Sequence, residues 1–426
     1  MSFFENRIKE QVVNALRRWG FHVAIDRIRW REIAGVELHD VILTRQSATG
    51  QSVRIEKIIA RLFLWRSFIH FSPECELKAE KVSIDLRIVS DAPLCFTTFE
   101  TAFRFGKKRQ LAQVDADGLS FLLQHDRCKT HDDFYLQIPS APWDDIVGPL
   151  RPYLLCPWVK EACSANRLSL VACYRRGKSP QVPDYFDAKI EAKDFSLSYP
   201  AGEEYPQIDR AFLVKALNDK LGASFVPYDD LPESLVGAFV CTEDPQFWDH
   251  KGISPYFIGY AIRENLQRKK ISRGASTITM QVARNLFLNH NRTLLRKAEE
   301  GIIALLLENY HKVGKQTIME LYANLIEFAP GIYGVQAASR FYFDKDVCEL
   351  LLTEVLTLTY IIPRPRHFYE ALLDRTEQLR RNLRRHIRSY ASVMFRKRII
   401  GEREYKDIDY TLRFAPRFGT LDLLIP

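Results

Sequence analysis

Two glutamates in the second half of the chain, Glu243 and Glu300, have neighbours that would give them opposite tendencies to ionise. Glu243 opens the run EDPQFWDHKG, in which Pro245 disfavours the helical conformation at Asp244, so the preceding helix is predicted to end at this acidic pair. The C-terminal end of a helix is unfavourable for carboxylates. A carboxylate that is reluctant to ionise suits a general base, whereas an ordinary surface helix end is the simpler interpretation of this run alone.

Glu300 ends NRTLLRKAEE, a run with helical spacing. Arg296 and Lys297 precede it by four and three residues, so both cations can reach its carboxylate on a helix and hold it ionised. Ion pairs of this kind are common on helices, and the pattern alone does not define a site. Together with Glu243, however, it matches the pair of carboxylates in opposite environments that divides acid and base duties at sugar centres.

The segment between the two glutamates is rich in hydroxyls and cations. RGASTITMQ, residues 273–281, is a small-residue turn entering a helix, where free backbone N–H groups suit an anion, although a plain N-cap is the simpler interpretation. The basic residues of the segment are Arg263, Arg268, Lys269, Lys270, Arg273, Arg284 and Arg292. They would suit a pyrophosphate leaving group or a nucleic-acid backbone, so the residues alone indicate carboxylate-dependent chemistry on an anionic substrate.

These residues need a scaffold, and length and composition indicate a folded protein of two or three domains. The chain has 426 residues, of which 46% are hydrophobic and 27% charged, and a formal net charge of +8. The basic excess fits an anionic ligand, a membrane surface or nucleic acid. The eight cysteines include no CxxC pair, and we expect buried thiols, with one or two disulfides left open.

The hydrophobic periodicity changes near residue 205. VSIDLRI, residues 82–88, alternates strictly between apolar and polar side chains, and similar runs in the first 200 residues predict a half-buried antiparallel sheet. After polar connectors at 174–185 and 199–207, the spacing becomes helical, as in CELLLTEVLTLTYII. We therefore predict a β-rich domain over residues 1–204, a mostly α-helical domain over 205–395 and a C-terminal tail over 396–426.

The N-terminus predicts an amphipathic helix and no signal peptide, because Glu5, Lys9 and Glu10 interrupt any apolar core. We expect this helix to pack on its own domain, with a membrane surface as the alternative. No stretch of the sequence approaches the roughly 20 apolar residues that would span a bilayer. How the chain would be anchored, and whether it oligomerises, the sequence does not indicate.

Four short motifs, in order and at matching spacing, resemble those of glycosyltransferase family 51, the peptidoglycan glycosyltransferases. The first, Glu-Asp-x-x-Phe-x-x-His-x-Gly, is matched by Glu243, Asp244, Phe247, His250 and Gly252. The second, Gly-x-Ser-Thr-Ile-Thr-Gln-Gln, is matched by Gly274, Ser276, Thr277, Ile278, Thr279 and Gln281, and is followed by Asn285 and Arg292. The third, Arg-Lys-x-x-Glu, is matched by Arg296, Lys297 and Glu300. The fourth comprises Lys315, Ile318, Glu320, Tyr322 and Asn324, in a stretch that we otherwise interpret as mostly architecture.

The resemblance implies an α+β chain of two domains, in which a lysozyme-like helical domain polymerises lipid II into glycan strands. Glu243 would deprotonate the 4-hydroxyl of the acceptor sugar, which attacks the donor with inversion as undecaprenyl pyrophosphate leaves. Glu300 would act with Arg284, Arg292 and Lys297 in stabilising the pyrophosphate. The other substrate-binding residues implied are Asp244, Phe247, His250, Gly274, Ser276, Thr277, Gln281, Asn285 and Arg296.

By the same resemblance, no cofactor is tightly bound, and a divalent cation, Mg²⁺ or Mn²⁺, near Glu300 is left open. The expected partners are lipid II, the growing glycan strand, a membrane surface and other cell-wall synthesis proteins, with no nucleic acid. The expected location is the bacterial cell envelope, at the periplasmic face of the cytoplasmic membrane. RGAST and the stretch after Asn324 resemble the monofunctional branch, and no SxxK serine site or KTG follows Gly334, so we expect no transpeptidase activity.

Several positions depart from the family pattern. Met280 replaces a glutamine, Tyr260 stands where a basic residue is usual, and Arg384 and Arg385 occupy apolar positions of a fifth motif. None of these removes a carboxylate, but together they leave room for an alternative, a catalytically weak or inactive envelope protein that binds lipid-linked saccharide. A sugar-cleaving enzyme is disfavoured by the cations around Glu300. The order of strand-like runs in residues 1–204 resembles AsmA-like domains of bacterial envelope proteins and leaves the role of this domain open.

Overall fold

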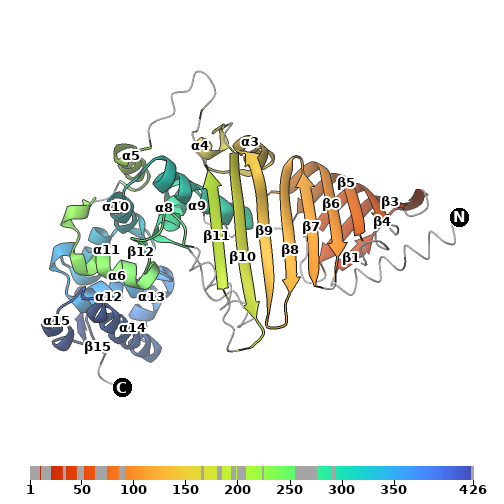
Figure 1. Ribbon diagram of the computed structural model, residues 1–426. Coiled ribbons are helices and arrows are strands. Elements are labelled where there is room, and N and C mark those ends of the chain that lie inside the picture. The colour runs from red at the N-terminus through yellow and green to blue at the C-terminus, as the bar shows by residue number, and fades with distance from the viewer. Residues whose placement is uncertain are drawn as a thin grey trace. The chain divides into compact units, whose positions relative to one another are not determined.

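The computed structural model (Figure 1) divides into two compact units. The sheet unit comprises Met1–Tyr205, Pro255–Ala275 and His290–Glu299, and the helical unit comprises Pro206–Ser254, Ser276–Asn289 and Glu300–Pro426. The structure describes residues 10, 21–31, 35–45, 52–62, 74–85, 90, 92–106, 108–164, 167–179, 185–192, 198, 208–222, 225–254, 276–289, 291 and 293–423. Apart from residue 10, the amphipathic helix predicted at the N-terminus lies outside this range.

The sheet unit is built on an 11-stranded antiparallel sheet, as the alternating sequence predicts. From β3 onward each strand pairs with the next along the chain, and β1 and β2 both pair with β3. The strands are β1 (Phe21–Ala24), β2 (Arg27–Arg31), β3 (Gly35–Arg45), β4 (Ser52–Leu62), β5 (Glu74–Asp85), β6 (Leu94–Phe105), β7 (Arg109–Ala116), β8 (Leu119–Arg127), β9 (His131–Pro142), β10 (Arg167–Gly177) and β11 (Tyr185–Ala192).

Strand alternation places apolar side chains on one face of the sheet. Val82 lies opposite Ile55 of β4 and Phe96 of β6, so these side chains stack across the three strands. They belong to an apolar cluster whose buried members are Ala79, Val82, Leu94, Phe96 and Ala116. The intervening positions carry charged pairs, for example Lys57 and Glu80, whose Nζ and Oε1 atoms lie 3.0 Å apart.

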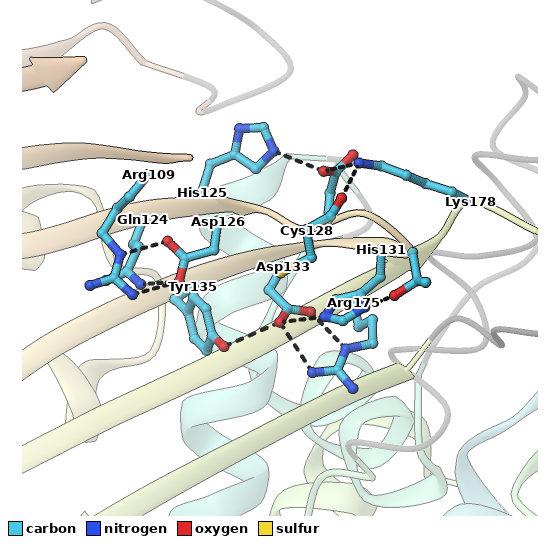
Figure 2. Close-up of polar contacts among 12 residues, drawn as sticks. Arg109, Gln124, His125, Asp126, Cys128, His131, Asp133, Tyr135, Arg175 and Lys178 are labelled. Atoms are coloured by element: carbon cyan, nitrogen blue, oxygen red, sulfur yellow. Dashed lines mark hydrogen bonds and ion pairs between the residues drawn. The ribbon is translucent and has the colours of Figure 1, made fainter. Parts of the chain in front are cut away.

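Cross-strand ion pairs join β7 to β8 and β9 to β10 near one end of the sheet (Figure 2). The carboxylate of Asp133 accepts hydrogen bonds from the Arg175 guanidinium at 2.8 and 3.1 Å, which holds the pKa of that carboxyl below its usual range. Asp126 accepts two hydrogen bonds from Arg109 at 2.7 and 2.9 Å. Opposite charges placed directly across a ladder favour one register over its alternatives, so these pairs help to fix the strand alignment.

Three short helices follow β9 and lie at one end of the sheet (Figure 1): α3 (Trp143–Val147), the 3-10 helix η1 (Gly148–Tyr153) and α4 (Pro157–Lys160). Trp143 and Trp158 are buried, and the indole N–H of Trp143 donates to the carbonyl of Ala162 at 3.0 Å. A buried donor needs an acceptor, and this hydrogen bond satisfies the Trp143 indole inside an irregular segment.

The cysteines correct one expectation. All eight are free thiols, but only Cys156 and Cys241 are fully buried, whereas Cys95, Cys128 and Cys348 are exposed. Cys128 follows the end of β8 and Cys95 lies on the polar face of β6, which a cysteine count cannot reveal.

The helical unit is mostly α-helical, as predicted, and its lysozyme-like character stays a prediction. Its elements are α5 (Arg210–Leu221), η2 (Tyr228–Asp230), α6 (Glu233–Glu243), α8 (Ile278–Phe287), η3 (Leu306–Tyr310), α10 (Lys315–Leu325), β12 (Glu327–Ala329), β13 (Ile332–Tyr333), α11 (Val335–Phe343), η4 (Val347–Glu349), α12 (Leu352–Ile361), α13 (Pro365–Leu373), α14 (Glu377–Arg396), α15 (Glu402–Lys406), β14 (Thr411–Arg413) and β15 (Thr420–Asp422). Residues of α9 (Leu294–Leu305) belong to the sheet unit up to Glu299 and to the helical unit from Glu300.

The core of the helical unit is centred on α12, which is buried along almost its whole length and contacts α6 and α14. On α14, Leu379, Leu383 and Ile387 form the buried stripe at helical spacing. Arg385 is exposed and Arg384 half-buried, so the two arginines flank that stripe and do not interrupt it. No helix in the described part of the chain combines the length and the apolar character that a bilayer span requires.

Candidate active site

The helix before the acidic pair ends where the sequence predicts. Leu235 and Phe239 of α6 are fully buried, and Asp244 is the C-cap, with φ −151° and ψ 75°. Glu243 is therefore the last helical residue, at the end where the helix dipole disfavours an ionised carboxylate.

Glu243 is held by residues of α8. Its Oε2 accepts a hydrogen bond from the Gln281 side-chain amide at 3.1 Å. Burial raises the pKa of the Glu243 carboxyl above its ordinary value, and the nearby Asp244 raises it further, while Gln281 and Arg284 act in the opposite direction. The result is a carboxylate of increased basicity with one amide donor fixing its orientation, which is the state that a general base requires.

Asp244 joins the first motif to the second. The side chain is 1% exposed, and its Oδ2 accepts hydrogen bonds from His250 Nε2 at 2.9 Å and from the backbone N–H of Ile278 at 3.0 Å. Since the carboxylate accepts, Nε2 of His250 carries the proton. Asp244 Oδ1 and His250 Nδ1 have no hydrogen-bond partner among the described residues.

The start of α8 is a plain N-cap, the interpretation that these residues alone favour. Thr277 is its N-cap, with a hydroxyl that accepts from the Met280 N–H at 3.1 Å and donates to the Gly252 carbonyl at 2.6 Å. The alternative was a set of free N–H groups suited to an anion, but the Ile278 N–H donates to Asp244, so the anion at this helix start is the protein's own carboxylate. The plain N-cap was the right interpretation.

Gly252 ends the first motif against α9. Its φ is +86°, and a Cβ there would lie 2.4 Å from the carbonyl oxygen of Ala304. Ala304 lies one turn beyond Glu300 on the same face of α9. The loop of the first motif therefore packs closely against the turn of α9 that begins at Glu300, and only glycine permits this approach.

Glu300 itself is fully buried on α9, within the helical unit. Arg296 is buried and Lys297 half-buried on the preceding turn, where the Thr293 hydroxyl accepts from the Arg296 N–H at 3.2 Å. The ion pairing of Glu300 with these two cations stays a prediction.

One buried charge cluster was not predicted. Lys315 Nζ lies 2.8 Å from Glu308 Oε2 and 4.4 Å from the centre of the Phe247 ring, and the Thr279 hydroxyl donates to Glu308 Oε1. Burial lowers the pKa of Lys315, and the Glu308 carboxylate acts against that shift. Phe247 is fully buried beside this pair, so it serves the packing of the site.

Two members of the fourth motif are architectural, as expected. Glu320 accepts from the Arg210 guanidinium at 2.7 and 2.8 Å and from the Tyr228 N–H at 3.0 Å. Asn324 pairs with the backbone of Val226, accepting at 2.9 Å and donating at 2.8 Å. Both side chains tie α10 to the segment that leads into α6.

Tyr322 of the same motif is fully buried, and its ring meets Phe239 edge-on at 5.3 Å. Its hydroxyl has no hydrogen-bond partner among the described residues. Burial raises its pKa, and Glu243 raises it further, which places the hydroxyl within the electrostatic reach of that carboxylate.

The positions that depart from the family pattern and the other predicted site residues differ in their burial. Met280 is buried, so the position of the missing glutamine is a core position here. Asn285 and Ser276 are half-buried, and Asn285 Oδ1 accepts from Arg284 at 3.3 Å. Gly274, Arg292 and Tyr260 lie outside the described residues.

Comparison with known proteins shows which family this site resembles. Residues 211–389 match the family described as transglycosylase. The chain is 38% identical over 151 residues to a biosynthetic peptidoglycan transglycosylase of Chromobacterium violaceum, covering 35% of this chain and 65% of that protein. It is 39% identical over 144 residues to the protein of that name from Thiobacillus denitrificans, covering 34% and 61%. To penicillin-binding protein 1A of Aquifex aeolicus it is 42% identical over 159 residues, covering 37% and 22%.

Residues 211–389, which lie in the helical half of the chain, thus match the transglycosylase family. The recognition of glycosyltransferase family 51 from the four motifs is confirmed. The chain spans less than two thirds of the length of each relative named above. The resemblance of residues 1–204 to AsmA-like domains stays a prediction.

Proposed function

We propose that this chain polymerises lipid II into peptidoglycan glycan strands, with undecaprenyl pyrophosphate as the leaving group. The observation that carries the proposal is the state of Glu243, a carboxylate with a raised pKa, oriented by Gln281 and placed beside the Asp244–His250 pair. The match of residues 211–389 to transglycosylases supports it.

In the proposed reaction Glu243 accepts the proton of the acceptor's 4-hydroxyl. The oxygen forms a bond to the anomeric carbon of the donor as the bond from that carbon to the pyrophosphate oxygen breaks, so the configuration inverts. A pKa raised by burial increases the driving force for proton transfer, and the Gln281 amide keeps Oε2 in place. Asp244 and His250 have a structural role in this reaction, because they hold the loop that follows Glu243 against the start of α8.

The leaving group carries negative charge, which Arg284 of α8 and, by the family resemblance, Lys297 and Arg292 would balance. A divalent cation at Glu300 would add electrophilic stabilisation of the pyrophosphate. Among the described residues no three His, Cys, Asp or Glu side chains cluster as metal ligands. Mg²⁺ is commonly held by one or two carboxylates and substrate phosphates, so a single glutamate fits that mode of binding.

The proposed place of action is the bacterial envelope, at the periplasmic face of the cytoplasmic membrane, where lipid II is presented by a bilayer. The growing glycan strand and other cell-wall synthesis proteins are the proposed partners. Residues 1–204 are proposed to be an AsmA-like domain.

The test is polymerisation of lipid II in liposomes, read as glycan strands on a gel. Glu243→Gln keeps the shape of the side chain and its contact with Gln281 but removes the base, so strands should be lost. Glu233→Gln is the matched control, because Glu233 is an exposed glutamate in the first turn of the same helix. A folded parent that makes no strands with Mg²⁺ or Mn²⁺ would contradict the proposal and favour a protein that binds lipid-linked saccharide.

A further inference from the structure

The residue before Glu300 has partners far away in the sequence. The carboxylate of Glu299, 1% exposed, accepts hydrogen bonds from the backbone N–H of Leu155 at 2.9 and 3.2 Å and of Cys156 at 2.8 Å. These N–H groups immediately precede α4, and they and Glu299 all belong to the sheet unit. Burial raises the pKa of Glu299 and the two N–H groups lower it, so the bonds offset part of the cost of burying the carboxylate.

An apolar contact fixes the same stretch of α9. Leu295 packs against the apolar cluster of the sheet, together with Phe99 and Tyr153. Leu295 and Glu299 are four residues apart, so their side chains lie on one face of the helix. The first half of α9 therefore has both an apolar and a charged anchor in the sheet unit.

We infer that Glu299 is a positioning residue for the reaction, whose hydrogen bonds set the direction in which Glu300 leaves α9. The inference rests on the proposed function, because it assigns Glu300 to the catalytic machinery. Successive helical residues have a fixed angular offset, so holding the Glu299 side chain also holds the direction in which Glu300 leaves the helix. Small displacements of groups that stabilise a transition state are costly in rate, which makes such an anchor valuable.

Glu299 occupies one of the two unspecified positions of Arg-Lys-x-x-Glu, so the family motif does not require a carboxylate there. The N–H groups of Leu155 and Cys156 lie 143 residues or more before Glu299 in the sequence, so the contact needs the β-rich part of the chain. The β-rich domain, whose role the sequence leaves open, thereby contributes to the geometry of the third motif.

The experiment removes the contact from both sides in the full chain. Glu299→Ala removes the acceptor, and Glu299→Gln keeps an acceptor oxygen without the charge. Leu155→Pro removes one donor; Leu154 has ψ 142°, which suits a following proline, and the Leu155 side chain is 42% exposed, so little packing is lost. Asp117→Asn is the matched control, because Asp117 also accepts from two successive N–H groups of the sheet unit, those of Thr97 and Thr98, at 2.8 and 2.7 Å.

Two quantities are measured for each variant: kcat and KM for lipid II polymerisation, and amide hydrogen exchange of residues 294–305. We expect Glu299→Ala and Leu155→Pro to lower kcat about tenfold or more at nearly constant KM and to speed exchange in α9. Glu299→Gln should recover part of the loss. Combining Glu299→Ala with Leu155→Pro should cost less than the sum, because both remove the same bonds.

Three results would overturn the inference. If the variants exchange amide hydrogens in α9 at the parental rate, the contact does not hold this helix. If exchange is faster but kcat is parental, the contact does not affect the reaction. If Asp117→Asn lowers kcat equally, the effect is one of general stability. An active parent with unaffected variants overturns this inference alone. A parent that makes no strands overturns the proposed function, and this inference with it.

Discussion

The buried pair of Lys315 and Glu308 gives a stability prediction that can be worked from the geometry. Lys315→Met removes the ammonium that lies 2.8 Å from Glu308 Oε2 and leaves a carboxylate whose side chain is 2% exposed, with only the Thr279 hydroxyl as a donor in the described contacts. Breaking a buried pair from one side costs about 3–5 kcal/mol. The contact with Phe247 adds about 0.5–2 kcal/mol, part of which the methionine side chain restores. We expect a loss of about 4 kcal/mol.

Urea unfolding, followed by the helical signal in far-ultraviolet circular dichroism, reports mainly on the helical unit, because the other unit is mostly sheet. The decisive comparison is the double variant Glu308→Gln, Lys315→Met. The amide keeps an acceptor for Thr279 and carries no charge, so about 2 kcal/mol of the loss should be recovered. If the double variant is no more stable than Lys315→Met, the uncompensated charge is not the cause and the reasoning fails.

Three further outcomes are expected. Tyr322→Phe should change the free energy of unfolding by less than about 1 kcal/mol, because the hydroxyl has no partner among the described residues; a larger loss in thermal unfolding would reveal one. Gly252→Ala should cost more than about 2 kcal/mol, since a Cβ would meet the Ala304 carbonyl oxygen, and an unchanged urea midpoint would contradict that packing. Burial lowers the pKa of His386 from its usual 6.5 to about 4, so only the unfolded state takes up a proton between these values. Stability should therefore fall as pH falls through that window, by up to about 3 kcal/mol, and His386→Gln should flatten the slope.

The local features of the fold could be predicted from the sequence. Period-two alternation around Val82 predicts the sheet, and the Glu-Asp-Pro order predicts the end of α6 at Asp244. Thr277 as the N-cap of α8 follows from its residue type and the apolar run after it. In each case the signal and the structure it predicts lie within one element, so no knowledge of the tertiary structure is needed.

The remaining features depend on contacts between distant segments. The start of α8 is occupied by Asp244, which lies 34 residues earlier, and Glu299 meets N–H groups about 144 residues before it. Glu308 lies in a π-helical turn, so the helical spacing that pairs charges on an α-helix does not indicate its partner Lys315. The sequence neighbours of Glu243 and Glu300 bring the two carboxylates into one hypothesis, and only the motif resemblance assigns their roles.

The division of α9 between the two units also has a consequence for how the protein is made. The strands of the sheet pair mostly with their neighbours in the chain, so the meander can form hairpin by hairpin as the polypeptide leaves the ribosome. Leu295 and Glu299 emerge about a hundred residues after β11, and until then the apolar cluster and the N–H groups of Leu155 and Cys156 lack these contacts. The sheet unit is therefore complete only once the third motif has been synthesised, which ties the maturation of the first unit to the synthesis of the second.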